Sequence, residues 1–137
     1  MLFYLIYVSS AVKLMRDNEL LFLLQQSREK NLVLGITGML LYKGGNFMQM
    51  LEGEKQTVLK LYETIRKDDR HKDVVTIMTD NIQTRNFADW SMGFANMDQI
   101  GNFPKYDVYI EKNLALRDFQ EDSRAAYRLL TLFNRRN

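Results

Sequence analysis

The sequence predicts an α+β protein in which two helices cover one face of a single mixed sheet of five strands. A continuous apolar run begins the chain, and two amphipathic segments each lie between strand-like segments. The resulting order is β α β β α β β. Because two helices that each cross between strands of one sheet lie on the same face, this order favours a ferredoxin-like arrangement. A chain of 137 residues suits one domain, and we expect a C-terminal helical extension against the opposite face.

The first segment is typical of a central strand. Residues 1–8, MLFYLIYV, are apolar on both of their alternating faces. They are far fewer than the roughly 20 residues needed to cross a bilayer, and no basic segment precedes them. We therefore expect a buried strand, no membrane span and a cytoplasmic protein.

A helix is predicted next, over residues 18–31, with Asp17 as its N-cap. Leucines recur at three- and four-residue spacing along one side of this segment, and the stripe ends with the polar residues Ser27 and Asn31. One side of the helix therefore changes from apolar to polar towards its C-terminal end.

A hairpin should follow this helix. After a break at Gly35, residues 36–42 predict a strand, residues 43–45 a turn, and residues 46–52 a second strand that Gly53 ends. The remaining predicted elements are a helix around Val58 to Ile65, a strand over residues 74–82, a strand within residues 90–97, and a last helix over about 117–133.

Composition and motifs give little support to catalysis or to nucleic-acid binding. The net charge is only +2, there is no cysteine, and His71 is the only histidine, which excludes thiolate chemistry and a histidine-cluster metal site. The chain also lacks a phosphate-binding loop of the Walker type and a nucleophile elbow.

Uncharged polar residues lie on faces that should be apolar: Tyr7, Ser27, Asn31 and Gln49. An unpartnered buried hydroxyl or amide costs about 1–3 kcal/mol, so these groups should bond to one another or to a polar ligand. In the predicted fold the first and third strands are neighbours, which brings Tyr7 and Gln49 together beneath the groove between the helices. A core network and a planar heteroaromatic ligand both explain the pattern.

Five segments together resemble the BLUF domain, a flavin-binding sensor of blue light. They are LIYVSS at 5–10, Ser27 and Asn31 before GITGMLLY at 35–42, FMQMLEGE at 47–54, DDRH at 68–71, and RNFADWSM at 85–92. The resemblance extends from about residue 2 to 95, which leaves residues 96–137 as a helical cap or output segment.

The resemblance implies a noncovalently held flavin, usually FAD, with FMN or riboflavin as alternatives. It also implies that Tyr7 donates an electron and its proton to the photoexcited ring while the amide of Gln49 relays the proton and rearranges. The rearranged amide then bonds differently to the flavin, and absorption shifts to the red until the state relaxes in the dark. A glutamine suits this role because its side chain holds both a donor and an acceptor.

Further positions match the family's pocket. Asn31 would hold the edge of the ring, although a helix C-cap would explain it equally well. Charged or titratable residues near the flavin or its ribityl and phosphate groups would be Arg28, Lys30, Asp68, Arg70 and His71. A solvated surface role explains these five as well.

Trp90 and Met92 match the family's last motif, which is associated with passing the signal outward. One of the two would pack near Gln49, and ordinary core packing is the alternative. With no effector domain in view, we expect a sensor without catalytic activity that signals to an unidentified partner protein in a light-dependent manner and forms a homo-oligomer.

Two other classes of protein share the predicted fold. An acylphosphatase-like hydrolase would need an arginine in a phosphate-binding loop after the first strand, where residues 9–13 are SSAVK. An RNA-binding sheet would need an open face and a basic surface, and the charge balance gives little support to it.

Overall fold

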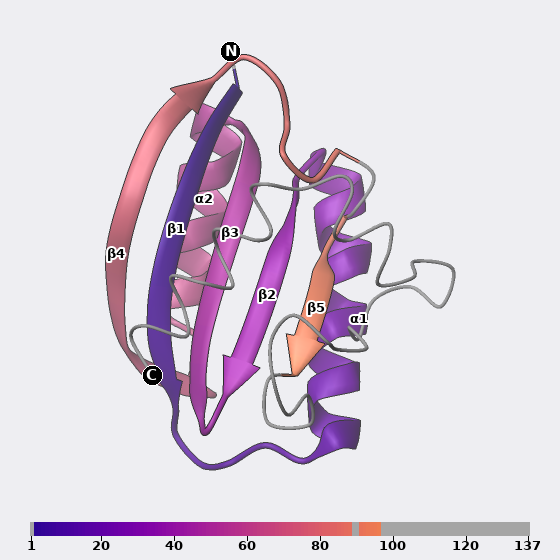
Figure 1. Ribbon diagram of the computed structural model, residues 1–137, viewed down its shortest axis with the longest axis vertical. Coiled ribbons are helices and arrows are strands. Elements are labelled where there is room, and N and C mark those ends of the chain that lie inside the picture. The colour runs from indigo at the N-terminus through magenta and orange to yellow at the C-terminus, as the bar shows by residue number, and fades with distance from the viewer. Residues whose placement is uncertain (1, 89–90, 97–137) are drawn as a thin grey trace.

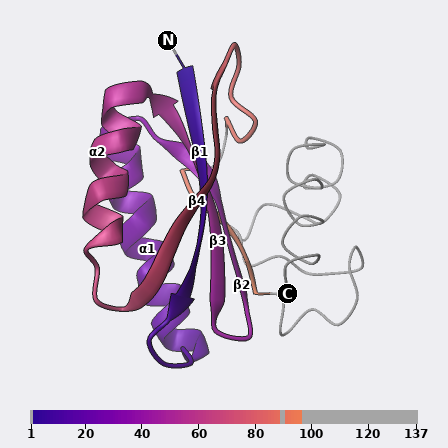
Figure 2. The ribbon, with the colours of Figure 1, turned by 90° about the vertical axis from the view of Figure 1, so that its left-hand side faces the viewer.

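The computed structural model describes residues 2–88 and 91–96, which form a five-stranded sheet with two helices on one face (Figures 1 and 2). The elements in chain order are β1 (Leu2–Ala11), α1 (Asp17–Leu34), β2 (Thr37–Lys43), β3 (Asn46–Glu54), α2 (Lys55–Arg66), β4 (His71–Ile82) and β5 (Gly93–Asn96). The order across the sheet is β4-β1-β3-β2-β5, which confirms the predicted fold class. The predicted extension over residues 96–137 lies outside the described residues except for Asn96, so its position stays a prediction.

The two central strands are β1 and β3, as the sequence predicts. They pair antiparallel with Tyr7 directly opposite Gln49. Both faces of β1 are buried at its middle, since Leu5 faces the helices and its neighbour Ile6 faces the other side. Among the described strands, β5 alone pairs parallel to its neighbour, β2, which makes the sheet mixed.

The helix α1 is longer than predicted at both ends. The backbone N–H of Arg16 donates to the Glu19 carboxylate at 2.9 Å, so the N-cap is Arg16 and Asp17 lies in the first turn. At the other end the helix continues to Leu34, and Gly35 with φ 70° forms the cap. The suggestion that Asn31 is a C-cap was therefore wrong, because Asn31 lies inside the helix.

The strand β3 continues through Gly53 to Glu54, so the prediction that Gly53 ends it was wrong. Gly53 remains paired with Phe3. A Cβ at Gly53 would lie 3.3 Å from the carbonyl oxygen of Gly35 and 3.3 Å from Cγ1 of Ile36. The glycine therefore permits close packing at the end of α1 instead of stopping the strand.

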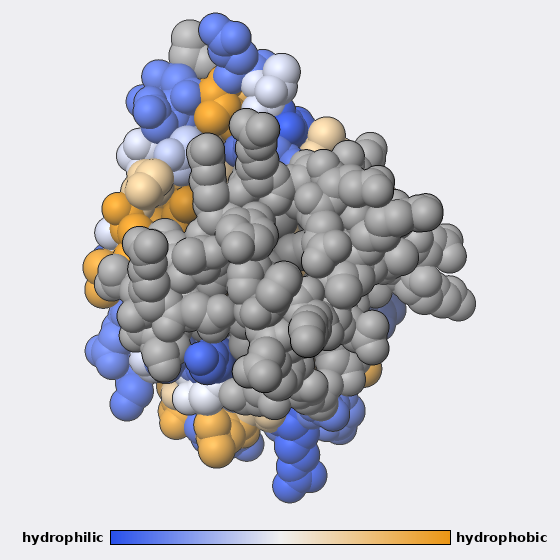
Figure 3. All heavy atoms as spheres, viewed as in Figure 1, coloured by the Kyte–Doolittle hydropathy of each residue, from blue (hydrophilic) through white to orange (hydrophobic). Residues whose placement is uncertain are grey.

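The strand β4 begins at His71, three residues before the predicted start. The prediction missed these residues because they are polar and show no alternation of apolar and polar side chains. Asp73 has a positive φ of 55° beside a break in the β1–β4 register. This strand forms one edge of the sheet, where Val75 and Met78 stay exposed, and hydrophobic surface is visible on that side in Figure 3. No helix in the described part of the chain is long and apolar enough to cross a membrane.

Replacing Gly38 by Ala should destabilise the fold strongly, since a Cβ there would lie 1.9 Å from the backbone oxygen of Met50 on the paired strand. We expect a loss of about 3 kcal/mol or more in the free energy of unfolding, measured by urea denaturation. Gly44→Asn is the matched control, because the hairpin turn at φ 55° accepts asparagine. Equal stability of the two variants would contradict the close approach of β2 and β3.

Candidate functional site

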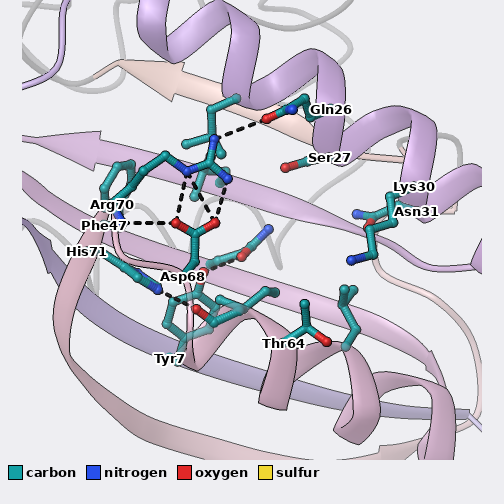
Figure 4. Close-up of a pocket in the computed structure, with 15 residues that line it drawn as sticks. Tyr7, Gln26, Ser27, Lys30, Asn31, Phe47, Thr64, Asp68, Arg70 and His71 are labelled. Carbon is teal, nitrogen blue, oxygen red and sulfur yellow. Dashed lines mark hydrogen bonds and ion pairs between the residues drawn. The ribbon is translucent and has the colours of Figure 1, made fainter.

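A cavity of about 250 Å³ lies between α1, α2 and the sheet, at the position that the sequence suggests (Figure 4). Its apolar walls are Leu23, Leu40, Phe47, Leu61 and Ile65. Its polar lining is Tyr7, Gln26, Ser27, Lys30, Asn31, Gln49, Thr64, Asp68, Arg70 and His71. Apolar walls with hydrogen-bonding groups among them suit a planar heteroaromatic ligand.

At the floor of this cavity, Tyr7 and Gln49 form a hydrogen-bonded pair. Both side chains are buried, with exposed fractions of 3% and 5%. The Tyr7 hydroxyl donates to Oε1 of Gln49, and Nε2 of Gln49 donates to the sulfur of Met92 at 3.4 Å. The donor and the acceptor of one amide are thus used by two different partners.

The tyrosine hydroxyl is held in its protonated form. Burial raises the pKa of Tyr7 above its ordinary value, and the nearby Tyr62 and Asp68 raise it further. The Tyr7 ring contacts Tyr62 with ring centroids 5.4 Å apart. Tyr7 therefore remains a hydrogen-bond donor throughout the physiological pH range.

Met92, with an exposed fraction of 1%, contacts Gln49 through its sulfur. Trp90, the other candidate for this place, lies outside the described residues. A thioether is a weak acceptor, so its bond to the amide is weaker than the one that Tyr7 makes.

Two side chains of α1 hold the backbone on which Met92 lies. Nδ2 of Asn31 donates to the carbonyl of Ser91 at 2.9 Å, and Nε of Arg28 donates to the carbonyl of Met92 at 2.9 Å. Asn31 also lines the cavity, whereas Arg28 is not among the lining residues. The site thereby connects α1 directly to the start of β5.

An ion pair lies at the α2–β4 side of the cavity. Nε of Arg70 donates to the two carboxylate oxygens of Asp68 at 2.9 and 3.2 Å, and its NH1 donates to Oε1 of Gln26 on α1 at 3.1 Å (Figure 4). The hydrogen bond from Arg70 lowers the pKa of Asp68 from 3.8 to about 2. Arg70 thus joins the two sides of the cavity opening.

His71 is bonded through both ring nitrogens. Nε2 lies 2.6 Å from the carbonyl oxygen of Ile65 and Nδ1 lies 2.8 Å from the Ser9 hydroxyl. Because a carbonyl can only accept, Nε2 carries a hydrogen, and in the neutral ring Nδ1 accepts from Ser9. His71 therefore joins the start of β4 to α2 and β1.

The loop after β1 does not offer a phosphate cradle. The N–H of Ala11 donates to the carbonyl of Gly45 at 2.6 Å, and the N–H of Val12 donates to the carbonyl of Arg70 at 3.0 Å. These backbone donors, at the end of β1 and just after it, are already used within the protein, and the site gives no support to the hydrolase alternative.

Seven lining residues were not predicted as site residues: the polar Gln26 and Thr64, and the apolar Leu23, Leu40, Phe47, Leu61 and Ile65. Gln26 is one turn before Lys30 on the same side of α1. Helical spacing from Lys30 and Asn31 could therefore have indicated that Gln26 also faces the cavity. Leu40 lies opposite Gln49 in the β2–β3 register, which no pattern in the sequence reports.

Fold and site together define a small α+β module whose cavity suits a planar cofactor above a tyrosine–glutamine pair. The profile of the BLUF family, described as sensors of blue-light using FAD, matches residues 2–93. The chain therefore belongs to the BLUF family. FAD, the cofactor expected from the sequence, is the one in the family's description.

Named relatives agree with this assignment. The photoactivated adenylate cyclase subunit beta of Euglena longa is 40% identical over 101 residues, which are 73% of this chain and 12% of that relative. The chain thus spans only a small part of the curated relatives that it matches.

Solved structures of BLUF proteins also superpose on this chain. BlrP1 of Klebsiella pneumoniae, solved with FMN and cyclic diGMP, has a TM-score of 0.76 and 33% identity, covering 97% of this chain and 34% of that one. BlrB in its dark state has a TM-score of 0.63 and 36% identity, with coverage of 66% and 69%.

The pair Asp68–Arg70 should stabilise the fold in a pH-dependent way. Because the pKa of Asp68 is lowered to about 2 in the folded protein, its contribution is present above about pH 4 and is lost as the pH falls through about 2. The difference in unfolding free energy between the wild type and Asp68→Asn should stay below about 1 kcal/mol, because both side chains are partly exposed and solvent screens the pair.

Urea denaturation at a series of pH values measures this difference. Asp69→Asn, which removes the neighbouring carboxylate, is the control and should show no such loss between pH 4 and 2. A wild-type advantage over Asp68→Asn that persists unchanged at pH 2 would contradict the assigned pKa.

Proposed function

We propose that this chain is a blue-light photosensor that binds FAD noncovalently in the cavity between α1 and α2. The observation that carries the proposal is the chain of contacts from Tyr7 through Gln49 to Met92 on the floor of that cavity. These contacts place three buried groups in a row: the Tyr7 hydroxyl, the Gln49 amide, which can exchange its donor and acceptor ends, and the flexible Met92 thioether.

The residues around the cavity divide into two groups by what they offer a flavin. Leu40, Phe47 and Leu61 offer apolar contact to the faces of a flat ring. The amide of Asn31 and the hydroxyl of Ser27 offer hydrogen bonds along its edge.

The charged residues suit the ribityl and phosphate portion. Lys30 on α1 and Arg70 after α2 provide positive charge on opposite sides of the opening, and Arg70 can exchange its bond to Gln26 for one to a phosphate oxygen. Asp68 keeps the Arg70 guanidinium oriented. His71 supports this side by fixing the start of β4 against α2.

The light step follows from the bonds of Gln49. When bound, the flavin absorbs blue light and its excited state accepts an electron. Tyr7 supplies that electron, and its hydroxyl proton moves to Oε1 of Gln49, the atom to which Tyr7 already donates. An amide that gains a proton at Oε1 and passes one from Nε2 to the reduced ring of a bound flavin, or that turns over, would reverse its donor and acceptor directions.

The local environment favours this reversal. The site is buried, so electrostatic differences between the two amide arrangements are only weakly screened. Nε2 gives up only a weak bond to the Met92 sulfur when the amide rearranges. Electron and proton return to Tyr7 in the dark, so the cycle consumes nothing.

The signal leaves through β5. Met92 contacts Gln49, and its carbonyl is held by Arg28, so a change at Gln49 alters the forces on the first residue before β5. The chain continues from β5 into residues 97–137. We place the output there, as light-dependent association with a partner protein or a second copy, and without catalytic activity in this chain.

The wild-type protein should be yellow and show a small red shift under blue light that reverses in the dark. Gln49→Leu should keep the flavin and lose the shift, because leucine has neither a donor nor an acceptor. Loss of one hydrogen bond, worth about 1 kcal/mol, should weaken flavin binding by only about fivefold. Difference absorption spectra and flavin titration measure both quantities.

Gln25→Leu is the control for this change, since Gln25 is exposed on α1 and its side chain donates to Glu29 on the same helix. It should behave as the wild type. A colourless wild type, or a normal shift in Gln49→Leu, would refute the proposed function.

Tyr7→Phe should retain the flavin, since the ring still fills its place against Tyr62. It should lack the normal red-shifted state because the electron and proton donor is gone. Tyr4→Phe removes a hydroxyl from the same strand on the opposite face and should keep the photocycle. Transient absorption distinguishes the two variants, and a normal photocycle in Tyr7→Phe would exclude Tyr7 as the donor.

A further inference from the structure

We propose that Glu52 is a positioning residue for the photocycle: its buried carboxylate holds the segment after β4 so that Met92 lies against Gln49. The proposal rests on the proposed function for its photochemical consequence. Glu52 is on β3, three residues from Gln49, and does not line the cavity.

Glu52 is completely buried, with an exposed fraction of 0%. Its neighbours on the same face of β3 are Met48 and Met50, which are also buried. A carboxylate in such apolar surroundings persists only if hydrogen bonds replace its water. The protein supplies them from two different segments.

Three donors reach the carboxylate. The hydroxyl of Thr37 on β2 donates to Oε1 at 3.0 Å, and the backbone N–H of Phe87 donates to the same oxygen at 2.9 Å. The backbone N–H of Asn86 donates to Oε2 at 2.6 Å. Two of the three donors therefore belong to the segment that follows β4.

Arg85 reinforces the same anchor. Its NH1 donates to the Thr37 hydroxyl oxygen at 3.1 Å and to the backbone carbonyl of Glu52 at 3.2 Å. Its NH2 donates to the carbonyl of Gly35 at 2.7 Å. Three consecutive residues, 85–87, are thereby fixed to β2, β3 and the end of α1.

This anchor matters for the site because of where the chain goes next. Figure 1 shows the chain leaving β4, crossing one end of the sheet and entering β5 on the far side of β2. The strand β5 has only four residues, and β2 is the one strand of the described sheet that pairs with it. So short a pairing leaves the position of Met92 dependent on the residues that precede it.

Glu52 and α1 hold this connection from opposite ends. Asn86 and Phe87 are bonded to Glu52, whereas Ser91 and Met92 are bonded to Asn31 and Arg28. Loosening the first attachment should widen the range of positions that the Met92 sulfur occupies. The bond from Gln49 to that sulfur would then be made less often in the dark.

Glu52→Gln tests the idea with little change in shape. An amide offers one acceptor oxygen in place of two, so at least one backbone donor of residues 86 and 87 loses its partner. We expect the dark-recovery rate to change by at least about threefold and the methyl NMR signal of Met92 to shift or broaden. Glu63→Gln, which replaces an exposed carboxylate on α2, should change neither quantity.

A double-mutant cycle separates positioning from general stabilisation. If Glu52 acts through Met92, its replacement should have no further effect on recovery in a Met92→Ala background. Equal effects of Glu52→Gln in both backgrounds would overturn the proposal. So would an unchanged Met92 methyl signal.

The methyl signal is measured on protein without flavin as well as with it, so the anchor is tested even if no light response exists. A wild type without a light-induced shift would refute the proposed function alone. Should Glu52→Gln fail to fold, Thr37→Val removes one bond to the same carboxylate and should shift the Met92 signal in the same direction. No shift in Thr37→Val would then overturn the proposal.

Discussion

The hydrogen bond between Tyr7 and Gln49 is the contact on which the rest of the site depends. It exists because β1 and β3 are the two central strands and pair in a register that sets these residues opposite each other. A shift of the register by one residue would turn every side chain of one strand to the other face and abolish the site. The long pairing of β1 with β3 therefore also keeps the Gln49 amide in place.

Burial gives this contact its chemical character. A water molecule would compete for both ends of the amide and for the tyrosine hydroxyl, so the donor and acceptor directions would average out. With both side chains almost inaccessible, the amide has few partners to choose from, and each arrangement becomes a distinct state. The weak bond to Met92 leaves one end of the amide easier to release than the other.

The same residues connect the cavity to the edge of the sheet. Asn31 faces the cavity and also holds the backbone before β5, so a ligand that engages its amide competes with or adjusts that attachment. Arg28, which the family resemblance places near the cofactor, donates to the carbonyl of Met92. A flavin held as proposed would therefore couple cofactor binding to the position of β5 through one face of α1.

Much of this protein was determined by local sequence pattern: the order of the elements, the two helices on one face, and the polar residues at positions 7, 31 and 49 within apolar stripes. These are consequences of hydrophobic periodicity, which acts over a few residues. Element ends depend on caps and on packing, which is why Gly53 was mistaken for a strand end. Only the tertiary structure decided that Met92 contacts Gln49 and that Arg70, which follows α2, bonds to Gln26 on α1. The same holds for the bonds by which Glu52 anchors residues 86 and 87. Such contacts join residues more than thirty positions apart, and the sequence contains no short-range signal for them.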